Sequence, residues 1–160
     1  MAATTMPKAL NNKVILKDLQ QKYSSVGFVA STHFKWSPSE KSIYYSDINN
    51  IDSLFSLFHE LAHGVLNHQD YQFDIELLQM EVAAWEKAIE IASQYNITIE
   101  HDHIDHALDS YRDWLHERAT CPVCSVVGME QKPQSYRCIN CNHAWAVSNA
   151  RFNRTYRMQN

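Results

Sequence analysis

The stretch Ile51–Leu66 reads IDSLFSLFHELAHGVL, and it decides how the rest of the chain must be arranged. Its apolar residues cover much of the circumference of a helix, which is typical of a helix buried in a core. Asn50 or Asp52 can cap its start by accepting a hydrogen bond from a free backbone N–H group. We therefore expect a buried helix that runs to about residue 68, with the other elements packed around it.

Two histidines and a glutamate interrupt this apolar helix. His59 and His63 are four residues apart, so they project from one face and can reach the same metal ion. Glu60 is offset from that face but close enough to contact a water molecule at the metal. Burying these side chains without partners would be costly, and a metal ion would compensate. The pattern is H-E-x-x-H, which predicts a zinc site with Glu60 as the general base of a peptidase.

A catalytic zinc site takes three protein ligands and keeps one position for water. We choose Glu81 as the third ligand, because it lies among apolar residues on a second predicted helix over residues 74–95. A carboxylate on the inward face of a helix usually has a partner. The alternative is a half-exposed Glu81 or one paired with a cation, and Glu76 and Asp74 are weaker substitutes.

Other histidines could take the place of Glu81. Three of them crowd the start of a further predicted helix over residues 102–118: His101, His103 and His106. Such a cluster is more often the solvated start of a helix. His68 lies five residues after His63, so it drifts away from the ligand face. We expect His68 to end its helix, where a protonated imidazole suits the negative end of the helix dipole.

The cysteines form two C-x-x-C pairs separated by 13 residues, Cys121 with Cys124 and Cys138 with Cys141. Each pair can grip one side of a tetrahedral ion, and four thiolates close the coordination of zinc, so the expected site is structural. A redox pair is the alternative, but neither pair opens a helix in a βαβ context. His143 could replace one ligand, although we expect the four cysteines to suffice.

The chain combines these helices with two predicted strands. Residues 27–36 and 42–46 are rich in β-branched and aromatic side chains, and Ser37-Pro38 begins a turn between them, which predicts a β-hairpin. A short helix is expected over residues 13–23. The fold class is therefore α+β: a small zincin-like core of hairpin and two helices, with a C-terminal zinc ribbon. We place the domains at residues 1–118 and 119–160.

The distribution of charge along the 160-residue chain supports this division. Hydrophobic residues make up 45% of the chain. The net charge is −4, which argues against a generic nucleic-acid-binding protein; it divides into −8 over residues 1–118 and +4 over residues 119–160. The first 12 residues lack the apolar run of a secretory signal, and no stretch is long enough to span a membrane. We expect a cytoplasmic protein.

The basic segment gives the ribbon a possible nucleic-acid partner. Its cations alternate with aromatic residues that could stack on bases: Lys132, Arg137, Arg151, Arg154 and Arg157 with Tyr136, Trp145, Phe152 and Tyr156. A solubilising tail or a protein-docking module is an equal alternative.

Residues 30–95 resemble small gluzincins, namely the minigluzincins and the ImmA/IrrE-type metallopeptidases. The resemblance rests on Trp36-Ser37-Pro38, Ile43-Tyr44-Tyr45, the run from His59 to His68, and Glu81-Val82-Ala83-Ala84-Trp85. It implies zinc ligands His59, His63 and Glu81, with Glu60 as general base. It also implies that the strand Ile43 to Ser46 is an exposed edge, where a peptide substrate adds as a strand.

On this resemblance, Ile43, Tyr44 and Tyr45 would bind the substrate; an ordinary hairpin arm is the alternative. The chain differs from ImmA/IrrE-type proteins in lacking a helix-turn-helix and in having the cysteine-rich tail. It also resembles SprT-like proteases, which join an H-E-x-x-H core to a zinc ribbon and act on DNA-bound proteins. Their third ligand is a histidine, and none follows His63 at a comparable short distance.

The expected function is hydrolysis of peptide bonds in a protein substrate, with one catalytic and one structural Zn²⁺. The oxyanion needs a further donor, for which His106 and Tyr111 are candidates. Two alternatives stay open: a nucleic-acid-associated zinc-ribbon protein, and a zinc-stabilised module without catalysis.

Overall fold

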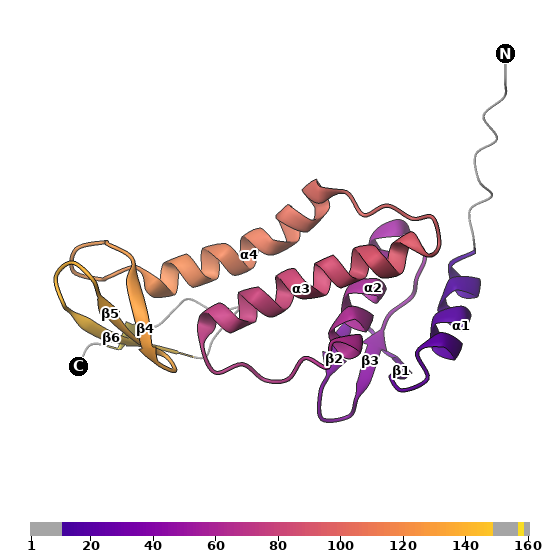
Figure 1. Cartoon of the computed structure of the whole chain (residues 1–160), viewed down its shortest axis with the longest axis horizontal. Coiled ribbons are helices and arrows are strands. Elements are labelled where there is room, and N and C mark those ends of the chain that lie inside the picture. The colour runs from indigo at the N-terminus through magenta and orange to yellow at the C-terminus, as the bar shows by residue number, and fades with distance from the viewer. Residues whose placement is uncertain (1–10, 149–156, 159–160) are drawn as a thin grey trace, which may run out of the picture. The chain divides into compact units, whose positions relative to one another are not determined.

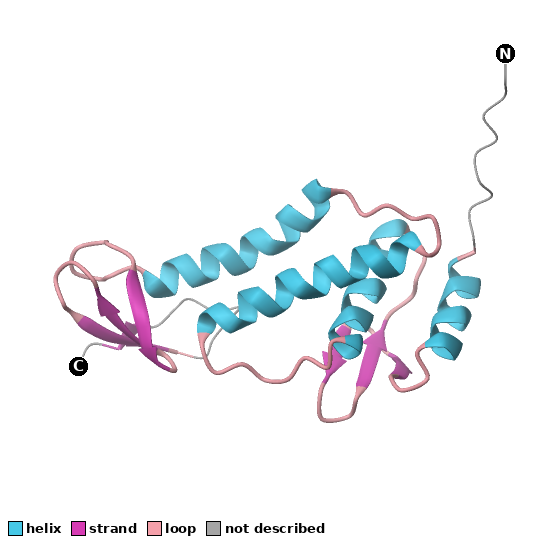
Figure 2. Ribbon diagram, in the orientation of Figure 1, coloured by secondary structure: helices cyan, strands magenta, loops and turns pink. Residues whose placement is uncertain are grey.

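The computed structural model describes residues 11–148 and 157–158. This part of the chain contains helices and small sheets (Figures 1 and 2), so the expected α+β class is confirmed. The elements are α1 (Asn12–Lys22), β1 (Gly27–Ala30), β2 (Lys35–Ser37), β3 (Ser42–Tyr45), α2 (Ile51–Val65), α3 (Asp74–Ser93), α4 (His101–Ala119), β4 (Gly128–Lys132), β5 (Ser135–Cys138), β6 (Ala144–Val147) and β7 (Arg157–Met158). Within these residues we find no helix with the length and apolar character needed to cross a membrane.

The chain forms two compact units, which are described separately. Unit 1 comprises Met1–His68 and Ala84–Ile99, and unit 2 comprises Gln69–Ala83 and Glu100–Asn160. The continuous helix α3 therefore contributes its first half to unit 2 and its second half to unit 1. Unit 2 contains the cysteine-rich segment together with α4. The division into domains at residue 118 stays a prediction.

Helix α2 has well-defined ends. Asn50 caps its start: the Asn50 side chain accepts from the Ser53 backbone N–H at 2.8 Å, and the Ser53 hydroxyl accepts from the Asn50 backbone N–H at 3.2 Å. At the other end Asn67 adopts a positive φ of 52°. The His68 N–H then bonds the His63 carbonyl at 3.0 Å, which closes a Schellman motif. The helix thus ends at Val65, earlier than the expected residue 68.

The sheet of unit 1 has the strand order β1-β3-β2. β2 and β3 form the expected antiparallel hairpin, and Lys41 completes its turn with a φ of 48°. The prediction of one continuous strand over residues 27–36 is wrong, because this segment divides into β1 and β2. β1 then pairs with β3 in parallel, an arrangement that a simple hairpin does not contain.

The prediction that β3 is an exposed edge is also wrong. β3 has a hydrogen-bonded neighbour on each side, β1 and β2, so a peptide cannot add beside it. Ile43 is fully buried, and the Tyr44 hydroxyl donates to Glu40 at 2.6 Å. The argument for Ile43, Tyr44 and Tyr45 as substrate-binding residues therefore loses its structural basis. The edges of this sheet are β1 and β2.

Apolar side chains of α2 form much of the core of unit 1. Helix α2 packs against β2 and β3, and its buried apolar residues share the interior with those of α1, β3 and the second half of α3. The main members are Ile15, Leu19, Ile43, Leu54, Leu57, Phe58, Leu61, Ala84, Ala88 and Ile91. The buried helix predicted around Ile51–Leu66 is confirmed.

Unit 2 contains α4 and the sheet of order β4-β5-β6-β7. All pairs in this sheet are antiparallel. Its small core includes Tyr136 and Trp145, whose rings stack with centroids 5.6 Å apart, and Val147. The Trp145 indole N–H donates to the Arg118 carbonyl at 2.9 Å, which ties β6 to the end of α4.

A buried ion pair at the start of α3 also organises unit 2. Arg118 donates to the Asp74 carboxylate through Nε at 2.6 Å and through Nη2 at 3.1 Å, and the Tyr136 hydroxyl donates to the same carboxylate at 2.6 Å. Asp74 is 2% exposed and Arg118 is 1% exposed. We call Asp74, Arg118 and Tyr136 the buried clamp. It joins α3, α4 and β5 within this unit.

Candidate metal centres

His59, His63 and Glu81 form the first of two groups that could hold a metal ion. One ligand atom from each residue lies within 4.8 Å of the others, and all three residues are buried. Both histidines come from one face of α2, as the spacing of four residues predicted. The sequence therefore identified three side chains that the structure brings together.

The two imidazoles present their Nε2 atoms to each other. The distance between these nitrogens is 3.1 Å, and the ring planes lie at 89°. Two nitrogens bound to one tetrahedral zinc ion at ordinary Zn–N lengths are roughly 3.3 Å apart. The spacing of the His59 and His63 nitrogens thus fits a shared ion.

The apolar face of helix α3 determines the direction in which Glu81 points. Residues 77, 84, 85 and 88 on this helix are buried, and Glu81 lies one turn before Trp85. The Trp85 ring stacks on His59 with centroids 4.3 Å apart and an interplanar angle of 26°. Packing of this face therefore directs a buried carboxylate toward the histidines, as its apolar neighbours predicted.

The other candidates for the third metal ligand have different partners or lie outside the group around His59. Asp74 belongs to the buried clamp, and the Glu76 carboxylate accepts backbone N–H bonds from Gln72 and Phe73 at 2.8 and 3.0 Å. These two hydrogen bonds lower the pKa of Glu76, and the bond from Phe73 has the larger effect. Within the described residues, the group around His59 includes none of the histidines at the start of α4, His101, His103 and His106.

Glu60 lies beside the group without belonging to it. Its Oε2 accepts a hydrogen bond from the backbone N–H of Trp36 at 2.7 Å, and the residue is half-buried. Trp36 is on β2, an edge strand, and its N–H points outward from the sheet toward this carboxylate. This bond fixes one oxygen of the Glu60 carboxylate at the edge of β2, and the residue directly follows the ligand candidate His59 on α2.

His68 lies outside the ligand group, as predicted, but it does not merely end the helix. Its Nδ1 atom is 2.8 Å from Nδ1 of His63, and its backbone carbonyl accepts from the Trp36 indole N–H at 2.8 Å. Sequence reasoning missed both contacts. The available signal was Asn67, since asparagine after a helix often takes the left-handed conformation that turns the chain back.

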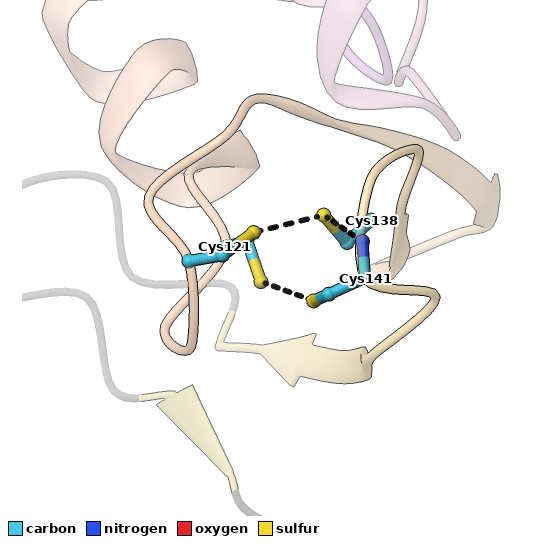
Figure 3. Close-up of side chains that lie close together, drawn as sticks. Cys121, Cys138 and Cys141 are labelled. Carbon is cyan, nitrogen blue, oxygen red and sulfur yellow. Dashed lines mark hydrogen bonds between the residues drawn. The ribbon is translucent and has the colours of Figure 1, made fainter.

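The four cysteines form the second group. Their sulfur atoms meet the same 4.8 Å limit, with Cys121 to Cys141 at 3.6 Å and Cys124 to Cys138 at 3.4 Å. Figure 3 shows the side chains of Cys121, Cys138 and Cys141 pointing toward a common centre. Sulfur atoms around a tetrahedral zinc ion are roughly 3.8 Å apart, so this spacing also fits one ion.

Backbone and side-chain donors favour the thiolate form of Cys124. The backbone N–H of Val126, followed by the side-chain amide of Asn140, lowers the pKa of Cys124 to about 6. Cys138 Sγ accepts from the backbone N–H groups of Asn140 and Cys141, each at 3.4 Å. Thiolates are the form that binds metal. His143 is not part of the group in the described residues; its ring stacks near Trp145, 6.3 Å between centroids.

The donor atoms of the two groups suit different roles. Two imidazoles and one carboxylate leave a position open on a tetrahedral ion, whereas four thiolates fill every position. Borderline and soft donors of these kinds favour zinc over magnesium or calcium. Both groups could therefore hold metal ions, and their chemistry fits Zn²⁺.

The described residues include part of the predicted nucleic-acid surface. Tyr136 and Trp145, which were expected to stack on bases, are buried in the core of unit 2. Arg137 is exposed and donates to Asn142 at 3.0 Å, and Lys132 is exposed at the end of β4. Residues 151–156 lie outside the described part of the chain, and for Arg157 only the backbone is described.

Comparison of the chain with protein-family models, curated proteins and solved structures found no match.

Proposed function

We propose that this chain is a zinc-dependent metallopeptidase that hydrolyses peptide bonds in a protein substrate. The observation that carries the proposal is the grouping of His59, His63 and Glu81 with Glu60 held beside them. Three ligands and an adjacent carboxylate are the set that metal-assisted hydrolysis requires. The resemblance of residues 30–95 to small gluzincins supports the same activity and a zincin-like core.

Each residue has a distinct task in this proposal. His59, His63 and Glu81 would hold Zn²⁺, which when bound supplies Lewis-acid chemistry to a peptide carbonyl. Glu60 takes a proton from the attacking water and delivers it to the leaving amine. Because the Trp36 N–H occupies Glu60 Oε2, we assign the proton to Oε1 of the same carboxylate.

The cysteine group would hold a second, structural Zn²⁺. Four thiolates leave no position for substrate, so we assign this ion no part in the reaction. Its contribution is to fold residues 121–141. The group belongs to unit 2, which also contains the buried clamp.

Glu60→Gln is the test of the proposed reaction. The amide can still accept the Trp36 N–H bond but cannot take up the proton, so hydrolysis should fall by about 100-fold or more. The full zinc-loaded chain would be incubated with a proteome-derived peptide library, and mass spectrometry would count new termini. Glu86→Gln, an exposed change on α3, is the matched control and should cleave like the unmodified protein.

Metal content separates loss of chemistry from loss of structure. The unmodified protein and Glu60→Gln should each bind two zinc ions, and Glu81→Gln should lose one of them. The proposed function fails if the unmodified protein forms no new termini, or if Glu60→Gln forms as many as the control. A count of one zinc ion in the unmodified protein would also refute it.

A further inference from the structure

An imidazole that binds a metal through one nitrogen has its second nitrogen free to carry a proton. That second N–H needs an acceptor, which sets the tautomer and the ring orientation. In His63, Nε2 faces His59 at 3.1 Å, so Nδ1 is the nitrogen directed away from the proposed ion. The Nδ1 atom of His68 lies 2.8 Å from it.

The end of helix α2 brings His68 to this place. Asn67, with its positive φ, reverses the chain, and two backbone bonds fix the reversal: Asn67 N–H to the Gly64 carbonyl at 3.1 Å and His68 N–H to the His63 carbonyl at 3.0 Å. The backbone of His68 is therefore held against the turn that carries His63. Its ring follows and stands edge-on to the His63 ring, at 71° and 4.9 Å between centroids.

Trp36 fixes the same region from strand β2. Its indole N–H donates to the His68 carbonyl at 2.8 Å, and its backbone N–H donates to Glu60 at 2.7 Å. Its ring covers Gly64: a Cβ atom at this position would lie 3.0 Å from Trp36 Cζ3. One residue thus contacts the helix on either side of His63.

We propose that His68 and Trp36 are positioning residues of the metal centre. This inference rests on the proposed function, since it assigns His63 to a metal ion. His68 accepts the Nδ1 proton of His63 and so holds the His63 Nε2 lone pair toward the ion. Trp36 anchors His68 through the carbonyl and Glu60 through the backbone N–H. Both act through other residues and touch neither metal nor substrate.

Two substitutions at position 68 separate hydrogen bonding from packing. In His68→Asn, the side-chain oxygen occupies nearly the place of Nδ1 and can accept the same proton. In His68→Leu, bulk remains but the acceptor is lost. Loss of an outer partner of a ligand histidine typically lowers metal affinity about 10- to 100-fold. We expect that loss in His68→Leu, and an affinity within about threefold of the unmodified protein in His68→Asn.

The measurement uses the full chain and Co²⁺ as a spectroscopic probe, in competition with a chelator. Thiolate-to-cobalt charge-transfer bands report the cysteine group. Both groups give ligand-field bands, so the part of the ligand-field absorption that does not rise in proportion to the charge-transfer bands reports the His59 group. Only that part should weaken in His68→Leu, and circular dichroism should stay unchanged. Trp36→Phe keeps the backbone N–H to Glu60 and loses the bond to the His68 carbonyl, so a smaller loss is expected. His101→Leu, an exposed change in unit 2, is the matched control.

The outcomes separate this inference from the proposed function. Equal cobalt affinity in His68→Leu and the unmodified protein would overturn the inference alone. So would His68→Asn binding as weakly as His68→Leu, because packing and not the acceptor would then matter. Cobalt binding at the cysteine group only, in the unmodified protein, would overturn both proposals.

Discussion

The two candidate metal centres differ in what holds their ligands. His59 and His63 stand on a capped helix, and that helix is packed into the core by side chains such as Leu57, Phe58 and Leu61. The cysteines stand on turns and on the end of a short strand. Within the described residues, six buried residues form the apolar cluster around them, and two of these are the cysteines Cys121 and Cys138.

This difference separates two uses of a metal ion. At the histidine group the fold provides the geometry, so a bound ion would add chemistry to an existing site. At the cysteine group the apolar core is small, so a bound ion would supply much of the stability of the fold. Four experiments test this contrast.

Removing one ligand from each centre should give the largest difference. Cys138→Ser should unfold residues 121–147, because apparent binding energies of about 10–16 kcal/mol are typical of structural zinc. His63→Ala should leave that segment folded. Amide hydrogen exchange in β4, β5 and β6 measures both. Slow exchange in β4 to β6 of Cys138→Ser would show that the sheet folds without the ion.

The buried clamp is expected to give the next largest effect. Asp74→Asn removes the charge that faces Arg118 and leaves that cation buried, which typically costs about 3–5 kcal/mol. The free energy of unfolding by urea measures the loss. Arg112→Gln breaks only exposed pairs with Asp105 and Asp109, so it serves as the control and should change stability by less than about 1 kcal/mol. Equal losses would mean that the clamp stabilises the fold no more than the exposed pairs do.

Two glycines allow a direct comparison of packing. In Gly128→Ala the new Cβ would lie 2.5 Å from the Trp145 ring and 2.7 Å from the Arg137 carbonyl oxygen, which is backbone and cannot easily move. In Gly64→Ala the nearest atom is 3.0 Å away, on the Trp36 ring, and alanine favours the helix. We expect losses of about 3 kcal/mol and about 1 kcal/mol in thermal unfolding. The reverse order would show that unit 1 is packed more rigidly than unit 2.

Glu130 should produce the smallest effect, visible only in pH dependence. Burial raises its pKa above the ordinary 4.5, against the opposing hydrogen bonds from the Asp74 and Gln134 backbone N–H groups. The folded state therefore holds the proton more tightly than the unfolded state. The stability from this group is complete below 4.5 and declines as pH rises through the raised pKa. Glu130→Gln should flatten that decline in urea titrations between pH 4 and 7; an unchanged slope would contradict it.

Local patterns predicted much of the fold and of the candidate metal groups. His59 and His63 are four residues apart, and the cysteines of each C-x-x-C pair are three residues apart. At such short separations the local backbone geometry alone places the side chains together. Glu81 required one further step, from the apolar neighbours on its helix to an inward direction. Each of these inferences depends on nearby sequence, which is why it could be made without a structure.

Contacts between distant residues could not be predicted in this way. Arg118 and Tyr136 are 44 and 62 residues from Asp74, and no repeating pattern connects them. Asp74 therefore entered only as a substitute metal ligand. The parallel pairing of β1 with β3 was missed for a related reason: neighbouring strands favour a hairpin, and only tertiary packing decides otherwise.

The distances along the chain within unit 2 imply an order of folding. Cys121 and Cys141 enclose a loop of 20 residues, whereas the Asp74 carboxylate must find partners two to three times farther along the chain. Closing a longer loop loses more chain entropy, and non-local contacts form more slowly. The cysteine knuckles, with any ion that they bind, should therefore assemble early, and the start of α3 should dock afterwards on a surface that is already in place.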